Sequence, residues 1–193
     1  MSQVINEDVQ NEQVEGYDLH PLRLGAVLAL AAAVAFFAWL LLKDDDKGSS
    51  RKGSAPVAAS VKELRRLPGS VGHSVYWAGI RSGYTYELTR TGDGNVYIRY
   101  LPTGVSLGDQ RPNYLTVGTY PHQNAFGTVS KAARRKGEIV RKLAGGGVAV
   151  SNKAIPRSVY IAYPGSDYLI EVYDRSPTRA RRLVVSGRVR PIG

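Results

Sequence analysis

The clearest hydrophobic pattern in the chain is an unbroken apolar run near its N-terminus. Residues 24–42 read LGAVLALAAAVAFFAWLLL and contain no charged or strongly polar side chain. As a helix, this run would be about 28 Å long, close to the hydrocarbon thickness of a bilayer. A long helix of a soluble domain normally keeps a polar face, and this run has none. We therefore predict one transmembrane helix at residues 22–42, with the lipid bilayer as its partner.

The residues that flank this run predict its orientation. A cleavable signal peptide fits poorly, because acidic residues precede the run and Leu-Leu-Leu-Lys ends it. Only Arg23 is basic on the N-terminal side, whereas Lys43, Lys47, Arg51 and Lys52 follow the run. The positive-inside rule favours a single-pass protein of the plasma (inner) membrane with a cytoplasmic C-terminal domain. An extracytoplasmic domain is the alternative.

The remaining sequence divides into three further segments by its polar pattern. Residues 1–21 form an acidic tail with no Lys or Arg. Residues 43–59, KDDDKGSSRKGSAPVAA, lack an apolar period and predict a flexible linker. Residues 60–193 predict one folded domain, which starts at a capping box formed by Ser60 and Glu63.

Two stretches of this domain resemble each other. SVYWAGIRSGYTYELTR at 74–90 aligns without a gap on SVYIAYPGSDYLIEVYD at 158–174, with seven identities over 17 positions. Alternating apolar and polar residues on both sides of a turn predict a β-hairpin in each copy. The repeat units extend over about 73–143 and 147–187.

The alternation also predicts which residues face each other across the strands. In the second copy, the register sets Val159 against Val172, Ile161 against Ile170, and Tyr160 against Glu171. The same register in the first copy sets Val75 against Leu88, Trp77 against Tyr86, and Tyr76 against Glu87. A three-residue loop at 92–94 then pairs Glu87 with Arg99, Leu88 with Ile98, and Tyr86 with Tyr100.

Helical periodicity follows the strands in both units. Apolar residues between Phe126 and Leu143 recur at helical spacing, and Gly137 weakens this helix or divides it in two. Ser176 and Pro177 predict the start of a second helix. We predict an α+β domain, in which an antiparallel sheet built from a duplicated hairpin packs against two helices. A pure β-barrel is the alternative.

Charge indicates a class of partner. The chain carries a net charge of +10, and residues 57–193 hold 21 Lys and Arg against 8 Asp and Glu. Two basic clusters on the predicted helices suggest an anion-binding patch for nucleic acid or anionic lipid head groups. No DNA-binding motif is present, so nucleic acid is possible but not favoured. The patch comprises Lys131, Arg134, Arg135, Arg181 and Arg182.

A row of polar residues gives a second candidate site. The predicted register brings Tyr76, Glu87 and Arg99 together on the exposed face of the sheet, with Tyr160 and Glu171 as the equivalent pair. These side chains could bind a ligand, or they could form a cross-strand stack with no ligand.

Catalytic chemistry has little support in the sequence. The chain has no cysteine, the domain's two histidines lack metal-ligand spacing, and no serine lies in a nucleophile elbow. Neither a metal nor a cofactor is expected. We therefore expect a membrane-anchored, non-catalytic binding or scaffold module that serves a protein partner. A membrane-tethered binder of anionic polymers is the first alternative, and an enzyme that uses Glu87 and Glu171 is the second.

Overall fold

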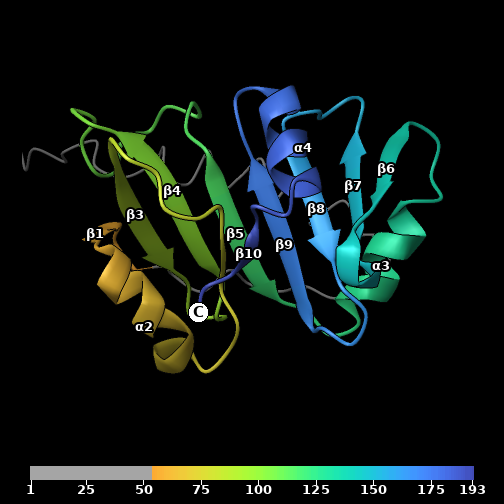
Figure 1. Ribbon diagram of the computed structural model, residues 1–193, viewed down its shortest axis with the longest axis horizontal. Coiled ribbons are helices and arrows are strands. Elements are labelled where there is room, and N and C mark those ends of the chain that lie inside the picture. The colour runs from red at the N-terminus through yellow and green to blue at the C-terminus, as the bar shows by residue number, and fades with distance from the viewer. Residues whose placement is uncertain (1–53) are drawn as a thin grey trace, which may run out of the picture.

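One antiparallel sheet of eight strands dominates the computed structural model, which describes residues 54–193 (Figure 1). The strand order across the sheet is β1-β3-β4-β5-β9-β8-β7-β6, and β2 pairs with β10 in a separate two-stranded sheet. The elements in chain order are β1 (Val57–Ala59), α2 (Val61–Val71), β2 (Tyr76–Trp77), β3 (Tyr84–Arg90), β4 (Val96–Pro102), β5 (Thr116–Pro121), α3 (Ala125–Ala132), β6 (Glu138–Lys142), β7 (Val148–Asn152), β8 (Ser158–Ala162), β9 (Tyr168–Tyr173), α4 (Pro177–Val185) and β10 (Arg190–Pro191), with a short 3₁₀ turn at Ala144–Gly146.

The predicted α+β class is confirmed in its coarse form, with a mostly antiparallel sheet and three helices. The predicted transmembrane helix at 22–42 lies outside the described residues. Within residues 54–193, every helix is too short or too polar to cross a membrane. The folded domain also includes residues before 60, because Val57–Ala59 of the predicted linker pair with β3.

Two of the three predicted registers are confirmed. Tyr160 faces Glu171 between β8 and β9, and Glu87 faces Arg99 between β3 and β4. In contrast, the predicted pairing of Tyr76 with Glu87 is wrong, because β2 leaves the sheet and Tyr76 pairs with Pro191 of β10.

Two tyrosine hydroxyl groups explain the departure of β2. The Tyr100 hydroxyl accepts a hydrogen bond from Ala78 N–H at 2.7 Å and donates one to Gly79 O at 3.2 Å. The Tyr86 hydroxyl accepts from Arg81 N–H at 2.8 Å. These side-chain hydrogen bonds satisfy backbone groups of the segment between β2 and β3. The segment therefore needs no strand partner there, and β2 runs across the face of the sheet.

The predicted helix between Phe126 and Leu143 is correct only in its first half. Asn124 caps α3, whose last residue is Ala132, and residues 138–142 form the edge strand β6. Gly137 separates the two at a φ of 90°, a backbone conformation that stops a helix. Beyond it, Ile139 and Val140 are β-branched and favour a strand.

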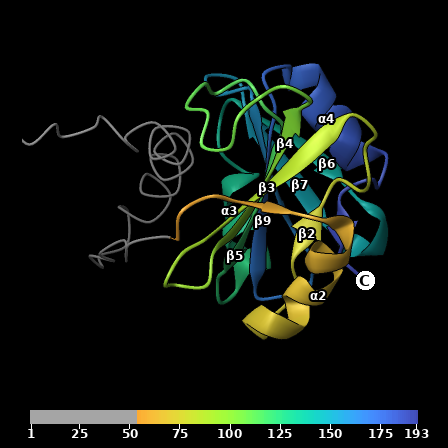
Figure 2. The same ribbon diagram turned by 90° about the vertical axis from the view of Figure 1, so that its left-hand side faces the viewer.

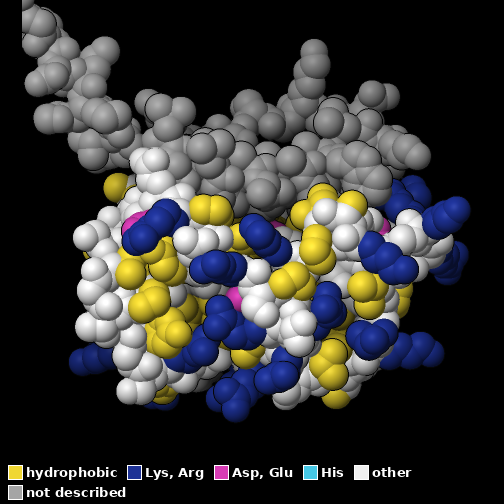
Figure 3. Space-filling model, turned by 90° about the horizontal axis from the view of Figure 1, so that it is seen from above, with side chains coloured by type: hydrophobic (Ala, Val, Ile, Leu, Met, Phe, Trp, Pro, Cys, Tyr) yellow, Lys and Arg dark blue, Asp and Glu magenta, His cyan; other side chains and the backbone are white. Residues whose placement is uncertain are grey.

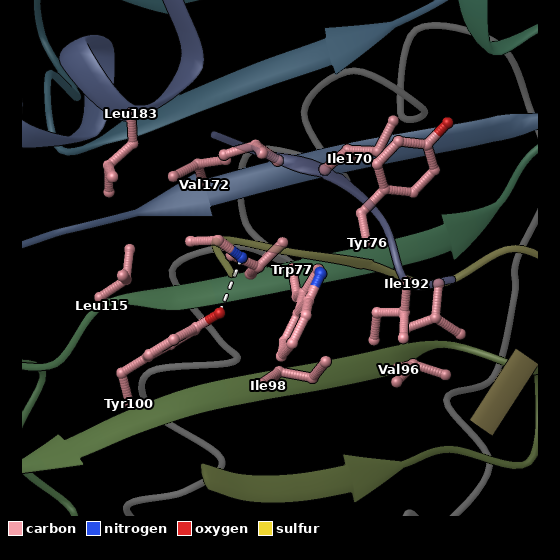
Figure 4. Close-up of a cluster of buried hydrophobic side chains, with 14 of the residues drawn as sticks. Tyr76, Trp77, Val96, Ile98, Tyr100, Leu115, Ile170, Val172, Leu183 and Ile192 are labelled. Atoms are coloured by element: carbon pink, nitrogen blue, oxygen red, sulfur yellow. Dashed lines mark hydrogen bonds between the residues drawn. The ribbon is translucent and has the colours of Figure 1, made fainter. Parts of the chain in front are cut away.

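The sheet is covered on both faces. On one face, α2, α4, β2 and β10 pack over a core that includes Trp77, Ile98, Ile170 and Val172 (Figures 2 and 4). On the other face, α3 packs over a second cluster around Val129, Tyr160 and Leu169. Polar residues of the sheet are therefore inside the domain, and they need partners there.

Trp77 provides a test of this core, since it lies in β2 within the core and is 4% exposed (Figure 4). We expect Trp77→Ala to lower the free energy of unfolding by about 3–5 kcal/mol, because the substitution leaves a cavity. Denaturant unfolding followed by near-ultraviolet circular dichroism measures this loss. Val185→Ala, at a position 56% exposed, is the control and should change stability by less than about 0.5 kcal/mol. Equal losses for the two variants would contradict the arrangement.

Candidate functional site

Glu171 is the centre of a buried polar cluster on the α3 side of the sheet. Its side chain is 4% exposed in the middle of β9. Oε2 accepts a hydrogen bond from the Tyr120 hydroxyl at 2.6 Å, and Oε1 accepts from Ser158 at 2.7 Å and Tyr160 at 3.1 Å. Three hydroxyl groups from β5 and β8 therefore surround one carboxyl group.

A glycine makes room for this cluster. Gly118 faces Glu171 across β5 and β9, and the Tyr120 ring lies over it. A Cβ atom at position 118 would come within 2.8 Å of the Tyr120 hydroxyl oxygen, closer than real contacts allow. The absence of a side chain at Gly118 therefore lets the Tyr120 hydroxyl reach Glu171.

Burial controls the protonation of this cluster. It raises the pKa of Glu171 above its usual value, although the three hydroxyl donors oppose this shift. Burial, together with the nearby Glu171 charge, also raises the pKa of Tyr120 and of Tyr160 well above the usual value. Both tyrosines therefore keep their protons at neutral pH and donate to Glu171.

Glu87 and Arg99 form a second buried pair on the same face, with exposures of 1% and 8%. Arg99 Nη1 donates to Glu87 Oε1, and the Gly108 N–H donates to Glu87 Oε2. Arg99 Nη2 donates to the Asp109 carbonyl at 2.7 Å. The pair therefore holds the β4–β5 loop, residues 103–115, against the sheet.

The residues of the predicted polar row do not lie together in the structure. Tyr76 is buried on the opposite face, where its ring stacks on Tyr163 with 6.4 Å between centroids. Glu87 and Glu171 share a face, but β4 and β5 separate their strands, which places them at least about 14 Å apart. The prediction of an exposed row is wrong for Glu87, Arg99, Tyr160 and Glu171, all of which are buried.

The predicted anion-binding patch is also divided. Lys131 belongs to α3, and Arg134 and Arg135 follow that helix, which covers the Glu171 face. Arg181 and Arg182 belong to α4, which covers the other face. The two basic clusters therefore do not form one patch on a single face.

A different surface gathers the positive charge. Five loops leave the same end of the sheet, at residues 78–83, 103–115, 133–137, 153–157 and 174–176. We call this end the basic end, and Figure 3 shows Lys and Arg side chains spread across it. Its cationic residues are Arg81, Arg111, Arg134, Arg135, Lys136, Lys153, Arg157 and Arg175.

Several residues of both sites were not predicted from the sequence. Ser158 has the same strand parity as Tyr160, so alternation alone could have placed it beside Glu171. Tyr120 and Gly118 could not be found in this way, because β5 pairs with a strand about 50 residues later. Within residues 54–193, no cluster of His, Asp and Glu could hold a metal ion.

Comparison of the chain with protein-family models, with curated proteins and with solved structures finds no match. Function is therefore inferred from the geometry of this domain and from the sequence pattern before it.

The raised pKa of Glu171 predicts a pH dependence of stability. Unfolding returns this carboxyl group to water, where it ionises at lower pH than in the fold. The folded state is thus penalised progressively as the pH rises from about 4.5 through the raised pKa. We expect Glu171→Gln, which remains neutral, to gain stability relative to the unmodified protein over this interval. Parallel curves of unfolding free energy between pH 4 and pH 8 would contradict the prediction.

The packing of Tyr120 over Gly118 predicts coupling between these residues. We expect Gly118→Ala to cost about 1–3 kcal/mol, because the new methyl group displaces the Tyr120 ring. In a Tyr120→Leu background the same change should cost much less, and a double-mutant cycle measures the difference. Gly69→Ala is the control, because that helical glycine has no neighbour within 4 Å and should not be destabilised. An equal cost of Gly118→Ala in both backgrounds would refute the coupling.

Proposed function

We propose that this protein is a membrane-anchored, non-catalytic binding module. A transmembrane helix at residues 22–42 attaches the chain to the plasma membrane, and the basic domain after it binds a partner. The domain lies on the cytoplasmic side of the bilayer, in accordance with the excess of Lys and Arg after the apolar run.

One observation carries the non-catalytic part of this proposal. All four carboxylate oxygens of Glu87 and Glu171 accept hydrogen bonds from groups of the domain itself. A general acid or base must reach the proton of a substrate, and a nucleophile must reach its reacting atom. Both carboxyl groups are buried and separated by two strands. This arrangement supports a structural role for each, instead of a shared catalytic role.

A second candidate function, the binding of an anionic polymer or lipid, has support of its own. The basic end carries eight cationic residues, and its loops contain two acidic residues, Asp109 and Asp174. Each of these acids is already paired, with Arg111 and Arg179 respectively. Net positive charge on exposed loops attracts polyanions. A protein partner with an acidic surface fits the same charge.

The membrane anchor is tested by cysteine labelling, because the chain has no cysteine of its own. Ala55→Cys introduces a thiol at an exposed position after the predicted span, and Gln10→Cys introduces a thiol before that span. In intact cells, a membrane-impermeant maleimide should label the Gln10→Cys chain and spare the Ala55→Cys chain. After lysis it should label both, and the protein should stay in membranes washed with carbonate.

Each other labelling pattern has a definite meaning. Labelling of Ala55→Cys alone in intact cells would place the domain outside and reverse the orientation. Labelling of neither position or of both positions in intact cells, with loss of the protein during the carbonate wash, would refute the anchor itself.

A further inference from the structure

The connections at the two ends of the sheet differ sharply in charge. Four turns leave the end opposite the basic end, at residues 91–95, 122–124, 143–147 and 163–167. These turns contain no Lys or Arg, whereas the five loops of the basic end contain eight. Charged residues that served only for solubility would be spread over both ends. The asymmetry therefore marks the basic end as a surface for a negatively charged partner.

Hydrogen bonds join the loops of the basic end into one surface. The Tyr173 hydroxyl donates to the Pro112 carbonyl at 2.6 Å, which fixes the loop that carries Arg111 beside the end of β9. The Asp174 N–H donates to the Arg157 carbonyl at 3.0 Å, and the Lys153 N–H donates to the Gly137 carbonyl at 3.1 Å. The cationic loops therefore extend over seven adjacent strands, a width of about 29 Å.

Exposed aliphatic side chains accompany these cations. Five large hydrophobic residues are exposed in the described part of the chain, and three of them, Ile80, Leu107 and Ile155, belong to loops of the basic end. Their exposed fractions are 61%, 44% and 44%. Each lies within four residues of a cation of its own loop, respectively Arg81, Arg111 and Lys153. Figure 3 shows hydrophobic and basic side chains interspersed on this end.

We propose that the basic end is a docking surface for an anionic phospholipid bilayer. Its Arg and Lys side chains contact lipid phosphates and carboxylates, while Ile80, Leu107 and Ile155 enter the boundary between head groups and acyl chains. This combination of cations and apolar side chains is what binding at a membrane interface requires. The inference names the partner of the binding module proposed above, and thus rests on that function.

Two observations favour lipid over nucleic acid. Exposed aliphatic side chains gain little from a sugar–phosphate backbone, but they gain from the acyl boundary. Aromatic rings that could stack on bases are engaged near this surface. Tyr114 is buried beneath Arg99, and Tyr84 is covered by the Arg81 guanidinium at 4.8 Å from its ring centre.

The chain enters the domain at the opposite end. The Ser54 N–H donates to the Arg90 carbonyl at 2.7 Å, beside the 91–95 turn. The basic end is therefore directed away from the point where the membrane anchor joins the domain. A probe on the loop itself detects contact with the anchoring bilayer and contact with a neighbouring bilayer alike.

The experiment uses the full chain with a single environment-sensitive fluorophore. Ile155→Cys is labelled with nitrobenzoxadiazole and reconstituted into liposomes of phosphatidylcholine alone, or with about 30% phosphatidylserine. We expect a blue shift and at least about a twofold rise in emission only with phosphatidylserine, reversed by about 0.5 M salt because screening weakens the contact. Val185→Cys is the matched control, since Val185 is exposed at the last position of α4, outside the basic end. Its emission should not depend on lipid composition.

Charge reversal tests the role of the cations. Arg157→Glu combined with Arg175→Glu should abolish the response of the labelled Ile155→Cys chain. Arg65→Glu combined with Arg66→Glu changes the net charge equally on exposed positions of α2 and should preserve the response. A response that is equal in both lipids, equal at Val185, or lost equally with both charge reversals would overturn the proposal. Tight binding of a DNA duplex, measured by anisotropy, without a response to phosphatidylserine would overturn it in favour of nucleic acid.

Failure of the anchor gives a different signal. A chain that carbonate removes from phosphatidylcholine liposomes refutes the transmembrane helix, whatever its fluorophore reports. The same labelled chain, added to preformed vesicles, still shows whether Ile155 contacts an anionic bilayer. The two proposals can therefore fail independently.

Discussion

The structure of this domain depends on the burial of a polar carboxyl group in the middle of its sheet. Glu171 lies on β9, next to β5, where the two halves of the sheet meet. A buried carboxyl group without partners would cost several kcal/mol, so the fold must supply donors from neighbouring strands. Tyr120 of β5 and Ser158 and Tyr160 of β8 do so. Their hydrogen bonds form only when the strands have this register, so the cluster that satisfies Glu171 also specifies how the halves join.

In the other half of the sheet, a buried carboxylate has a different kind of partner. Glu87 is nearly inaccessible on β3, and its partner Arg99 has a charge to neutralise it. The remaining hydrogen-bonding capacity goes to the backbone of the β4–β5 loop, through Gly108 and Asp109. Removal of either charged partner would leave the other buried and alone, which is the costly case for internal ion pairs. The Glu87–Arg99 pair thus positions a loop of the basic end, and the interior of the sheet supports the exposed surface.

The sequence predicts local pairing well and distant pairing poorly. The registers of β3 with β4 and of β8 with β9 follow from strand alternation and from short turns, and both are confirmed. The first copy of the repeat is similar to the second in amino-acid sequence, yet Tyr76 does not pair with Glu87. The Tyr100 and Tyr86 hydroxyls hold residues 78–81 out of the sheet, and such side-chain bonds have no periodic signature. The β5–β9 pairing, which brings Tyr120 to Glu171, is likewise invisible to local patterns.

Composition shows that the domain is basic, but the location of its charges follows only from the strand topology. Lys131 and Arg181 lie on helices that cover opposite faces, so clusters that look equivalent along the chain do not combine in space. Arg157 and Arg175, which are isolated in the sequence, lie on loops joined by the bond from Asp174 N–H to the Arg157 carbonyl. An antiparallel sheet sends alternate connections to opposite ends, so cations confined to alternate connections accumulate at one end only. The separation of charge between the two ends therefore follows from the order in which the chain connects the strands. The basic end is the end away from Ser54, where the rest of the chain joins the domain.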